Sequence, residues 1–159
     1  MKRIILLLVI FIVTFSASAQ SIPKMKIDQL AKLIDTSTSP LIVNFWASWC
    51  APCVQELPWF EKAAAEYKSK GLKLILVSLD FATDYPKVIL DFAKKKGYTS
   101  PIIWLDETDA DVFCPKIDKN WAGSIPATIF VNNKKKYRRF FGQQIPEPKL
   151  LQEIKLLLE

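Results

Sequence analysis

Apolar and polar positions follow two different spacings along the chain, and these spacings predict strands that alternate with helices. Residues 41–46 are almost all apolar, with aromatic and β-branched members, which is typical of a short strand buried on both faces. After Cys53 the apolar residues recur at helical spacing until Gly71 ends the pattern. The sequence therefore predicts a buried strand followed closely by an amphipathic helix.

The remaining segments continue this alternation. Helical spacing covers residues 26–34, 86–96 and 148–158. Strand-like runs cover residues 73–79, 102–105, 127–131 and 137–141. The last two runs flank Asn132 and Asn133 as a hairpin, and the first half of the polar stretch 106–120 is compatible with an acidic-capped helical turn. Together these elements predict an α/β fold, with a central mixed β-sheet flanked by helices on both faces.

The N-terminus has the three-part layout of a secretory signal peptide. A basic start precedes an apolar run, residues 4–15, which is followed by Ala-Ser-Ala. The run is shorter than the roughly 20 apolar residues that a membrane-spanning helix needs. We therefore expect a signal peptide over residues 1–19, cleavage near Ala19, and a single domain over residues 20–159. An uncleaved anchor that tethers the same domain to the membrane is the alternative.

Export would place the protein in the periplasm or another extracytoplasmic compartment, where its charge is only mildly basic. Two of the 22 basic residues lie in the predicted signal peptide, so the mature chain keeps 20 against 16 acidic residues, a net charge of +4. This excess is too small to imply a nucleic acid partner. Residues 134–139 (KKKYRR) concentrate five basic side chains. They favour a solvated turn leading into an edge strand, and an electrostatic dock for an acidic partner or lipid headgroups is the alternative.

The cysteines carry the chemistry that the sequence offers. The chain holds three cysteines and no histidine, which weakens imidazole metal sites and removes Cys-His catalysis. Cys50 and Cys53 are so close that a disulfide between them closes too small a ring to stabilise a fold. Zinc bound by four cysteines needs a second close pair, and Cys114 stands alone. We therefore expect redox chemistry at Cys50 and Cys53, with no metal and no cofactor.

The position of this pair suits disulfide exchange, which needs an attacking thiolate and a second thiol that resolves the mixed disulfide. Cys50 falls at the cap or first turn of the predicted helix, where free N–H groups and the helix dipole lower the pKa of a thiol. Cys53 falls almost one turn further along, on the covered side. Pro52 is tolerated near a helix start, where it restrains the geometry between the sulfurs. Trp49 would shield the site and offer substrates an apolar surface.

Residues 44–53 read NFWASWCAPC, residues 56–58 read ELP, and residues 123–128 read GSIPAT. These separated motifs resemble the thioredoxin superfamily, and most closely its exported TlpA/ResA-like branch. The resemblance implies a thioredoxin-like fold and a cis peptide bond between Ile125 and Pro126. It also implies that Pro126 packs beside the cysteines and that the backbone of Ile125 pairs with an extended substrate. Trp49, Ile125 and Pro126 are thus the predicted substrate-binding residues.

Asn44 and Glu56 distinguish the chain from cytosolic thioredoxin. Thioredoxin carries a buried aspartate for proton transfer where this chain has Asn44, which cannot titrate. The residue pattern alone leaves two interpretations of Glu56: an acid/base for Cys53, or a first-turn glutamate that favours the helix dipole. The TlpA/ResA-like branch has a functional glutamate at the matching position, and the resemblance therefore favours the acid/base role.

The resemblance further implies a reductant that acts on exported proteins. Proteins of this branch are recharged by a membrane thiol donor and reduce disulfides in exported partners, including apocytochrome c before haem attachment. We accordingly expect disulfide-containing exported proteins and a membrane thiol donor as partners, and a protein that acts as a monomer.

Two rival functions use the same fold. A peroxidase of related fold normally has a threonine three residues before its cysteine, where this chain has Ala47. A copper-binding or partner-binding module would be non-enzymatic, and copper chaperones of this fold use a CxxxC motif with histidine, which the chain lacks. Cys114 lies outside both shared motifs, and it is interpreted as a buried or incidental thiol, with an auxiliary redox site as the alternative.

Overall fold

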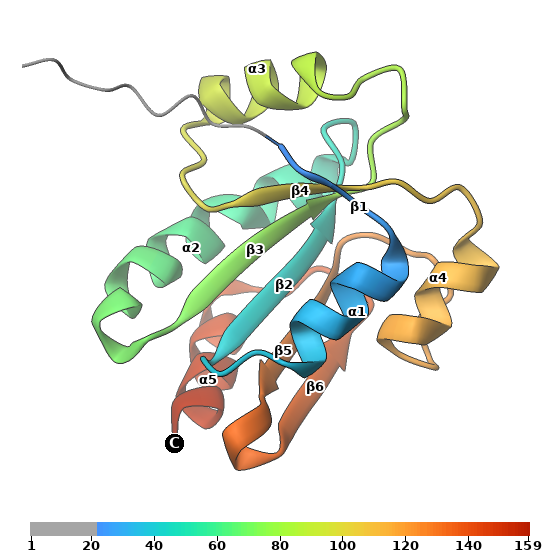
Figure 1. Ribbon diagram of the computed structural model, residues 1–159. Coiled ribbons are helices and arrows are strands. Elements are labelled where there is room, and N and C mark those ends of the chain that lie inside the picture. Colours follow the sequence, from blue (N-terminus) through green and yellow to red (C-terminus); the bar gives the residue numbers. More distant parts are fainter. Residues whose placement is uncertain (1–21) are drawn as a thin grey trace, which may run out of the picture.

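The computed structural model describes residues 22–159, so the predicted signal peptide lies outside the described residues. A six-stranded sheet in the order β1-β4-β3-β2-β5-β6 has helices on both of its faces (Figure 1). The strands are β1 Lys24–Met25, β2 Leu41–Trp46, β3 Lys73–Ser78, β4 Ile102–Leu105, β5 Ala127–Asn132 and β6 Tyr137–Phe141. The helices are α1 Ile27–Asp35, α2 Ala51–Glu66, α3 Lys87–Lys96, α4 Ala110–Ile117 and α5 Glu147–Leu158. Short 3-10 turns cover Lys68–Lys70 (η1) and Asn133–Lys135 (η2).

The sheet is mixed, as the sequence predicts. Strands β1, β4, β3 and β2 run parallel, whereas β5 is antiparallel to β2 and β6 is antiparallel to β5. Strand β2 lies between β3 and β5, and all six of its residues are buried. Helix α2 starts just after the carboxyl end of β2, which is a central strand. The cysteine motif therefore lies at the end of the sheet where the carboxyl end of β2 is found.

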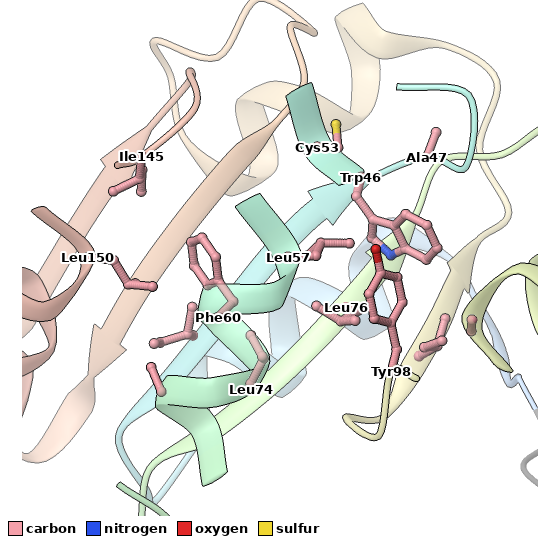
Figure 2. Close-up of a cluster of buried hydrophobic side chains, with 14 of the residues drawn as sticks. Trp46, Ala47, Cys53, Leu57, Phe60, Leu74, Leu76, Tyr98, Ile145 and Leu150 are labelled. Atoms are coloured by element: carbon pink, nitrogen blue, oxygen red, sulfur yellow. The ribbon is translucent and has the colours of Figure 1, made fainter. Parts of the chain in front are cut away.

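Each face of the sheet packs against its own apolar core. The core under α2, α3 and α5 includes Trp46, Phe60 and Leu76, which Figure 2 shows packed between helix and sheet. The core under α1 and α4 includes Phe45 and Val77. Neighbouring residues of one strand thus enter opposite cores, as expected for a strand buried on both faces.

The elements differ from the sequence predictions mainly at their ends. Helix α4 begins at Ala110, where the side chain of Asp109 accepts a hydrogen bond from the Asp111 amide, so it lies later in the polar stretch than the predicted turn. Strand β1 was not predicted, since two residues show no period. The predicted hairpin is present, and its turn is η2, which starts at Asn133, whereas Asn132 is the last residue of β5. The Asn133 side chain donates hydrogen bonds to the carbonyls of Ile34 and Ser37 in and after α1.

The basic run 134–139 occupies η2 and β6, and β6 is an outer strand of the sheet. This confirms the predicted turn leading into an edge strand. Arg138 there pairs with Asp35 at 2.9 Å. Within residues 22–159, no helix is long and apolar enough to cross a membrane.

Candidate active site

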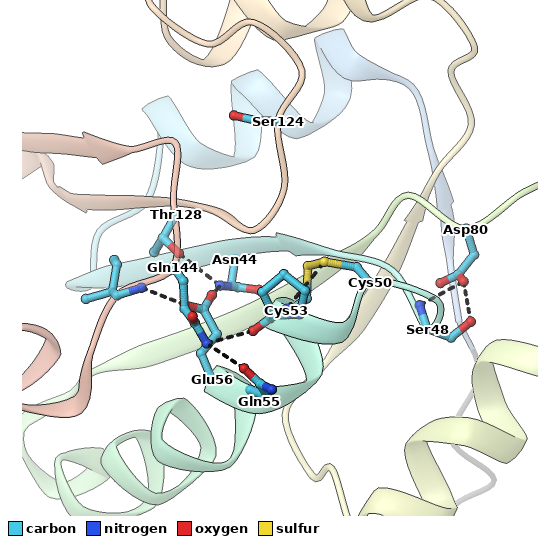
Figure 3. The surroundings of a disulfide bond; sticks show 12 residues. Asn44, Ser48, Cys50, Cys53, Gln55, Glu56, Asp80, Ser124, Thr128 and Gln144 are labelled. Carbon is cyan, nitrogen blue, oxygen red and sulfur yellow. Dashed lines mark hydrogen bonds between the residues drawn. A yellow bond between two sulfur atoms is a disulfide. The ribbon is translucent and has the colours of Figure 1, made fainter.

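A disulfide joins Cys50 and Cys53 at the N-terminus of α2 (Figure 3). The two Cα atoms lie 5.3 Å apart, and Cys50 is the N-cap residue of the helix. The sulfur of Cys50 accepts a hydrogen bond from the Cys53 amide at 3.3 Å. Cys50 keeps 5% of its surface exposed, whereas Cys53 has none. Cys50 is therefore the cysteine that a second molecule can reach first.

The chain before Cys50 fixes its place at the helix start. Strand β2 ends at Trp46, and the Ala47 carbonyl accepts a hydrogen bond from the Cys50 amide at 3.1 Å. Pro52 follows in the first turn of α2, where the missing N–H has no partner to lose. The sulfur of Cys50 thus sits at the positive end of the helix dipole, which stabilises a thiolate there when the disulfide is reduced.

Glu56 lies in α2 below the disulfide, and its side chain is fully buried. One carboxyl oxygen accepts a hydrogen bond from the Asn44 side chain at 2.8 Å, and the other accepts one from the Ile145 amide at 2.8 Å. Burial outweighs these two bonds and raises the pKa of Glu56 from 4.5 to about 7. A carboxyl group with this pKa can take up and release a proton near neutral pH.

Asn44 positions this carboxyl from the neighbouring strand. Its amide nitrogen donates to both Glu56 and the hydroxyl of Thr128, the latter at 2.9 Å. Asn44 in β2 and Thr128 in β5 are register partners, so the sheet itself fixes their contact. The amide oxygen of Asn44 is buried and has no hydrogen-bond partner among the described residues. The amide of Asn44, which cannot titrate, therefore holds the carboxyl group of Glu56, which can.

The peptide bond between Ile125 and Pro126 is cis, as the resemblance implied. Pro126 is buried and directly precedes β5, whose first residue Ala127 is the register partner of Phe45 in β2. This register places Pro126 level with the end of β2, where the cysteine motif begins. The half-buried side chain of Ile125 packs against both cores. The structure thus brings the two separated motifs to one edge of the sheet.

Trp49 lies on the surface beside Cys50, with 55% of its area exposed. Its ring stacks on that of Phe81, with the ring centroids 5.8 Å apart and the planes inclined by 19°. Phe81 follows β3 and is itself 65% exposed. The predicted apolar surface at Trp49 is therefore larger than the sequence suggested, because a second ring extends it.

Hydrogen bonds between the buried Asp80 and the half-buried Ser48 connect the two loops that carry these rings. One oxygen of Asp80 accepts hydrogen bonds from the amide and the hydroxyl of Ser48, at 2.9 and 2.6 Å. Sequence reasoning missed Asp80 and Phe81. Both residues could have been found from their position just after the predicted strand β3. Adjacent parallel strands such as β2 and β3 bring their carboxyl ends to the same edge of a sheet.

The loop between β6 and α5 covers the site from the other side. The side chain of Gln144 donates to the Pro52 carbonyl at 3.1 Å, and the next amide, that of Ile145, is the one that binds Glu56. The hydroxyl of Ser124 donates to the Gly142 carbonyl at 3.0 Å. This loop therefore touches the cysteine helix, the buried acid and the segment before Pro126.

Cys114 lies on the other face of the sheet from the disulfide, beside Gly123 at the start of the cis-proline motif. It is a free thiol in α4, buried in the core under α1 and α4, which lies on the opposite face of the sheet from Cys53. Burial raises the pKa of Cys114 to about 11. A buried, protonated thiol packs as a small apolar group, which agrees with the interpretation of Cys114 as a buried thiol. In the described part of the chain, no three His, Cys, Asp or Glu side chains gather as ligands for a metal ion.

Comparison with known proteins agrees with the geometry. A sequence profile of the AhpC/TSA family matches residues 14–139. The chain is 39% identical over 66 residues to the thiol-disulfide oxidoreductase ResA of Oceanobacillus iheyensis, covering 36% of this chain and 34% of that protein. It is 39% identical over 62 residues to the sporulation thiol-disulfide oxidoreductase A of Bacillus subtilis, covering 39% of this chain and 38% of that protein. The matched regions thus span little more than a third of these relatives.

Solved structures share the fold over most of the chain. A thioredoxin-related protein from Neisseria meningitidis matches with a TM-score of 0.64 and 26% identity, covering 76% of this chain and 86% of the other. StoA from Bacillus subtilis matches with a TM-score of 0.57 and 25% identity, covering 78% and 85%. The fold is therefore thioredoxin-like, as predicted.

Proposed function

The chain belongs to the AhpC/TSA family, and within this family we propose that it is a thiol-disulfide oxidoreductase that reduces disulfides in other proteins through Cys50 and Cys53. The observation that carries the proposal is the Cys50–Cys53 disulfide at a helix N-terminus, with the buried carboxyl of Glu56 behind it. Two matched relatives are named thiol-disulfide oxidoreductases, which supports the same activity here.

The proposed reaction has two exchange steps. In the reduced protein, the Cys50 thiolate attacks one sulfur of the client disulfide; a mixed disulfide forms and the first client sulfur leaves as a thiolate that takes up a proton. The Cys53 thiol then loses its proton and attacks the Cys50 sulfur. The mixed disulfide breaks, the second client sulfur leaves as a thiol, and the Cys50–Cys53 disulfide forms. Two electrons pass to the client, and a dithiol donor must return them.

We assign to Glu56 the acceptance of the proton from Cys53. Cys53 has no exposed surface, so bulk water cannot reach it freely. Glu56 lies three residues further along the same helix, and its pKa of about 7 suits proton exchange near neutral pH. Asn44 and Ile145 act as positioning groups, because each holds one oxygen of this carboxyl.

The substrate site proposed for this reaction comprises Trp49, Ile125 and Pro126. The residues lie at the same edge of the sheet as Cys50, with Ile125 in an irregular segment just before β5. An extended client segment can pair with the backbone there, and such pairing recognises main chain more than side chains.

The setting proposed for this activity is extracytoplasmic. Residues 1–19 serve as a signal peptide, residues 20–159 form one mature domain, and the mature domain acts as a monomer. The clients are disulfide-containing exported proteins, with apocytochrome c as a candidate, and a membrane thiol donor recharges the protein. Trapping clients on a Cys53→Ser variant tests these partners, and N-terminal sequencing of the secreted protein tests cleavage near Ala19.

The test of the activity is reduction of insulin disulfides, with dithiothreitol as the donor. We expect Cys50→Ser to remove turnover and Cys53→Ser to accumulate mixed disulfides, because each variant lacks one exchange step. Cys114→Ser is the matched control and keeps the wild-type rate, since Cys114 is buried on the other face of the sheet. Turnover by Cys53→Ser at the wild-type rate would contradict the mechanism.

Two further measurements separate the rival functions. A peroxidase would consume hydrogen peroxide with dithiothreitol at a rate that depends on Cys50, whereas the proposed reductase would not; Ala47 stands where such peroxidases have threonine. Titration with Cu(I) distinguishes a copper-binding module, which would show a tight stoichiometric site.

A further inference from the structure

We propose that Phe81, together with Trp49, selects client disulfides whose cysteines are flanked by aromatic or large aliphatic side chains. This inference rests on the proposed function, because it concerns which disulfides reach Cys50. It adds to the substrate site a residue from the loop after β3, which neither shared motif contains.

The two rings form an apolar platform on a surface that is otherwise poor in large apolar groups. Within the described residues, the exposed large apolar side chains are Trp49, Phe81, Val88, Val112 and Leu156. Two of these five, and both of the aromatic ones, are stacked on each other immediately beside Cys50. Covering an exposed aromatic pair with a partner is favourable because it removes apolar surface from water. Exposed apolar patches of this kind therefore mark contact sites.

The platform is held in place by hydrogen bonds to the buried carboxylate of Asp80. Ser48 directly precedes Trp49, and Asp80 directly precedes Phe81. The carboxylate of Asp80 is buried; it accepts two hydrogen bonds from Ser48 and one from the hydroxyl of Ser78 at 2.7 Å. The Asp80 carbonyl also accepts a bond from the indole of Trp104 at 2.8 Å. These bonds fix the two loops against each other, so the rings are arranged before any client arrives.

The location of the platform determines what can occupy it. A client disulfide that exchanges with Cys50 must bring one of its sulfurs to the Cys50 sulfur, and Trp49 is the adjacent residue in the chain. The side chains beside the client cysteine therefore pass over Trp49 and the ring stacked on it. The platform continues the proposed substrate site, so its occupant is the client segment itself rather than a separate partner.

The chemistry of the rings sets the preference. An aromatic or aliphatic side chain that packs on the two uncharged rings buries apolar surface, which is favourable. A small polar side chain leaves the rings exposed to water. Burying about 50 Å² of apolar surface at roughly 25 cal/mol per Å² corresponds to about a tenfold difference in affinity. We therefore expect a preference of about tenfold in kcat/KM, expressed mainly in KM.

The test compares two cyclic disulfide peptides that differ only in carrying Phe or Ser beside each cysteine, with dithiothreitol as the donor. Wild type should reduce the Phe peptide with a kcat/KM about tenfold higher. Phe81→Ala should lower that ratio to about twofold by raising KM for the Phe peptide, since only the Trp49 ring remains. Phe81 is mostly exposed, so the variant retains its fold.

Two controls distinguish selection from general damage. Val112→Ala removes an exposed apolar side chain in α4 and should keep the tenfold ratio. Ser48→Ala removes one bond of the loop connection and should lower the ratio, whereas Ser48→Thr keeps the hydroxyl and should restore it.

Loss of the Phe preference in Phe81→Ala, with the preference kept in Val112→Ala, supports the inference. Equal rates of wild type on both peptides, or an unchanged ratio in Phe81→Ala, overturn the inference alone. Failure of wild type to reduce either peptide overturns the proposed function, and this inference with it.

Discussion

Glu56 and Glu153 are two buried carboxyl groups on helices that cover the same face of the sheet. They differ in the groups that bind them. Both side chains are almost wholly inaccessible, at 0% and 1% exposure. Glu153 accepts a hydrogen bond from the hydroxyl of Tyr137 at 2.6 Å and pairs with the ammonium group of Lys149 at 2.9 Å. Glu56 has two amide donors, from Asn44 and Ile145, and within residues 22–159 no cation pairs with it.

The difference shows in the pKa values of the two acids. Burial acts to raise the pKa of both. At Glu153 this effect is outweighed by the Tyr137 hydroxyl and the charge of Lys149, and the pKa is lowered; at Glu56 burial prevails and the pKa rises to about 7. The Tyr137 hydroxyl and the charge of Lys149 therefore keep Glu153 ionised, whereas burial leaves Glu56 ready to exchange protons near neutral pH.

The largest expected effect is on the pH dependence of stability. Between pH 4.5 and 7 the unfolded state loses the Glu56 proton while the folded state keeps it, so the free energy of unfolding falls as pH rises. The full change is roughly 3 kcal/mol. We expect Glu56→Gln to lack this fall, as measured by urea unfolding of the oxidised protein at pH 5 and pH 8.

Glu153→Gln is the matched control for this measurement. Because the pKa of Glu153 is lowered, its stabilising contribution is present above the pKa of the unfolded state and is lost as pH falls through the folded value. The variant should therefore change stability in acid and leave the fall toward pH 8 intact. The same fall in Glu56→Gln as in wild type would show that this carboxyl is ionised freely in the folded protein.

The second effect is on turnover. Glu56→Gln should reduce insulin disulfides about 10²-fold more slowly at pH 7, because Cys53 loses its proton acceptor. Its pH–rate profile should also lack the step near pH 7 that the proposed role of Glu56 predicts for the wild-type protein. Glu153→Gln should stay within about twofold of wild type, since Glu153 is bound to Tyr137 and Lys149 and has no part in the exchange. Equal losses in both variants would mean that they act through the fold alone.

The smallest effect concerns the cation itself. Lys149→Met should leave Glu153 with the Tyr137 hydroxyl as its remaining side-chain partner, so that the pKa of Glu153 rises toward that of Glu56. Lys149 is 40% exposed, so solvent screens the pair and the loss of stability at pH 7 is about 1 kcal/mol. Titration of Glu153 by NMR checks the shift; an unchanged pKa would assign the difference between the two acids to Tyr137.

Much of the fold follows from the sequence because its elements are strongly periodic. Strands β2 and β4 begin and end where the apolar runs predict, and α3 ends at Gly97, which adopts a left-handed backbone with φ of 72°. The weaker predictions fall where tertiary contacts decide. Strand β1 exists only because β4 offers it a partner, and the side chain of Asn133 in the turn binds the end of α1.

The site is predictable to the extent that its residues adjoin the cysteines in sequence. The helix-start position of Cys50, the burial of Cys53 and the cis bond before Pro126 all agree with prediction. The partners of Glu56 do not follow from the sequence, since Asn44 and Ile145 reach it from β2 and from the loop before α5. Burial and the resulting rise in pKa depend on those distant elements, and no local pattern reports them.

The hydrogen bond from the Ile145 amide to Glu56 joins positions 89 residues apart. During synthesis from the N-terminus, the ribosome releases Cys50, Cys53 and Glu56 long before Ile145 exists. Until the loop before α5 packs against α2, Glu56 lacks the burial that raises its pKa above the ordinary value of 4.5. A chain without this loop therefore holds both cysteines but not the tuned carboxyl group, and the site is complete only when the segment around Ile145 has packed against α2.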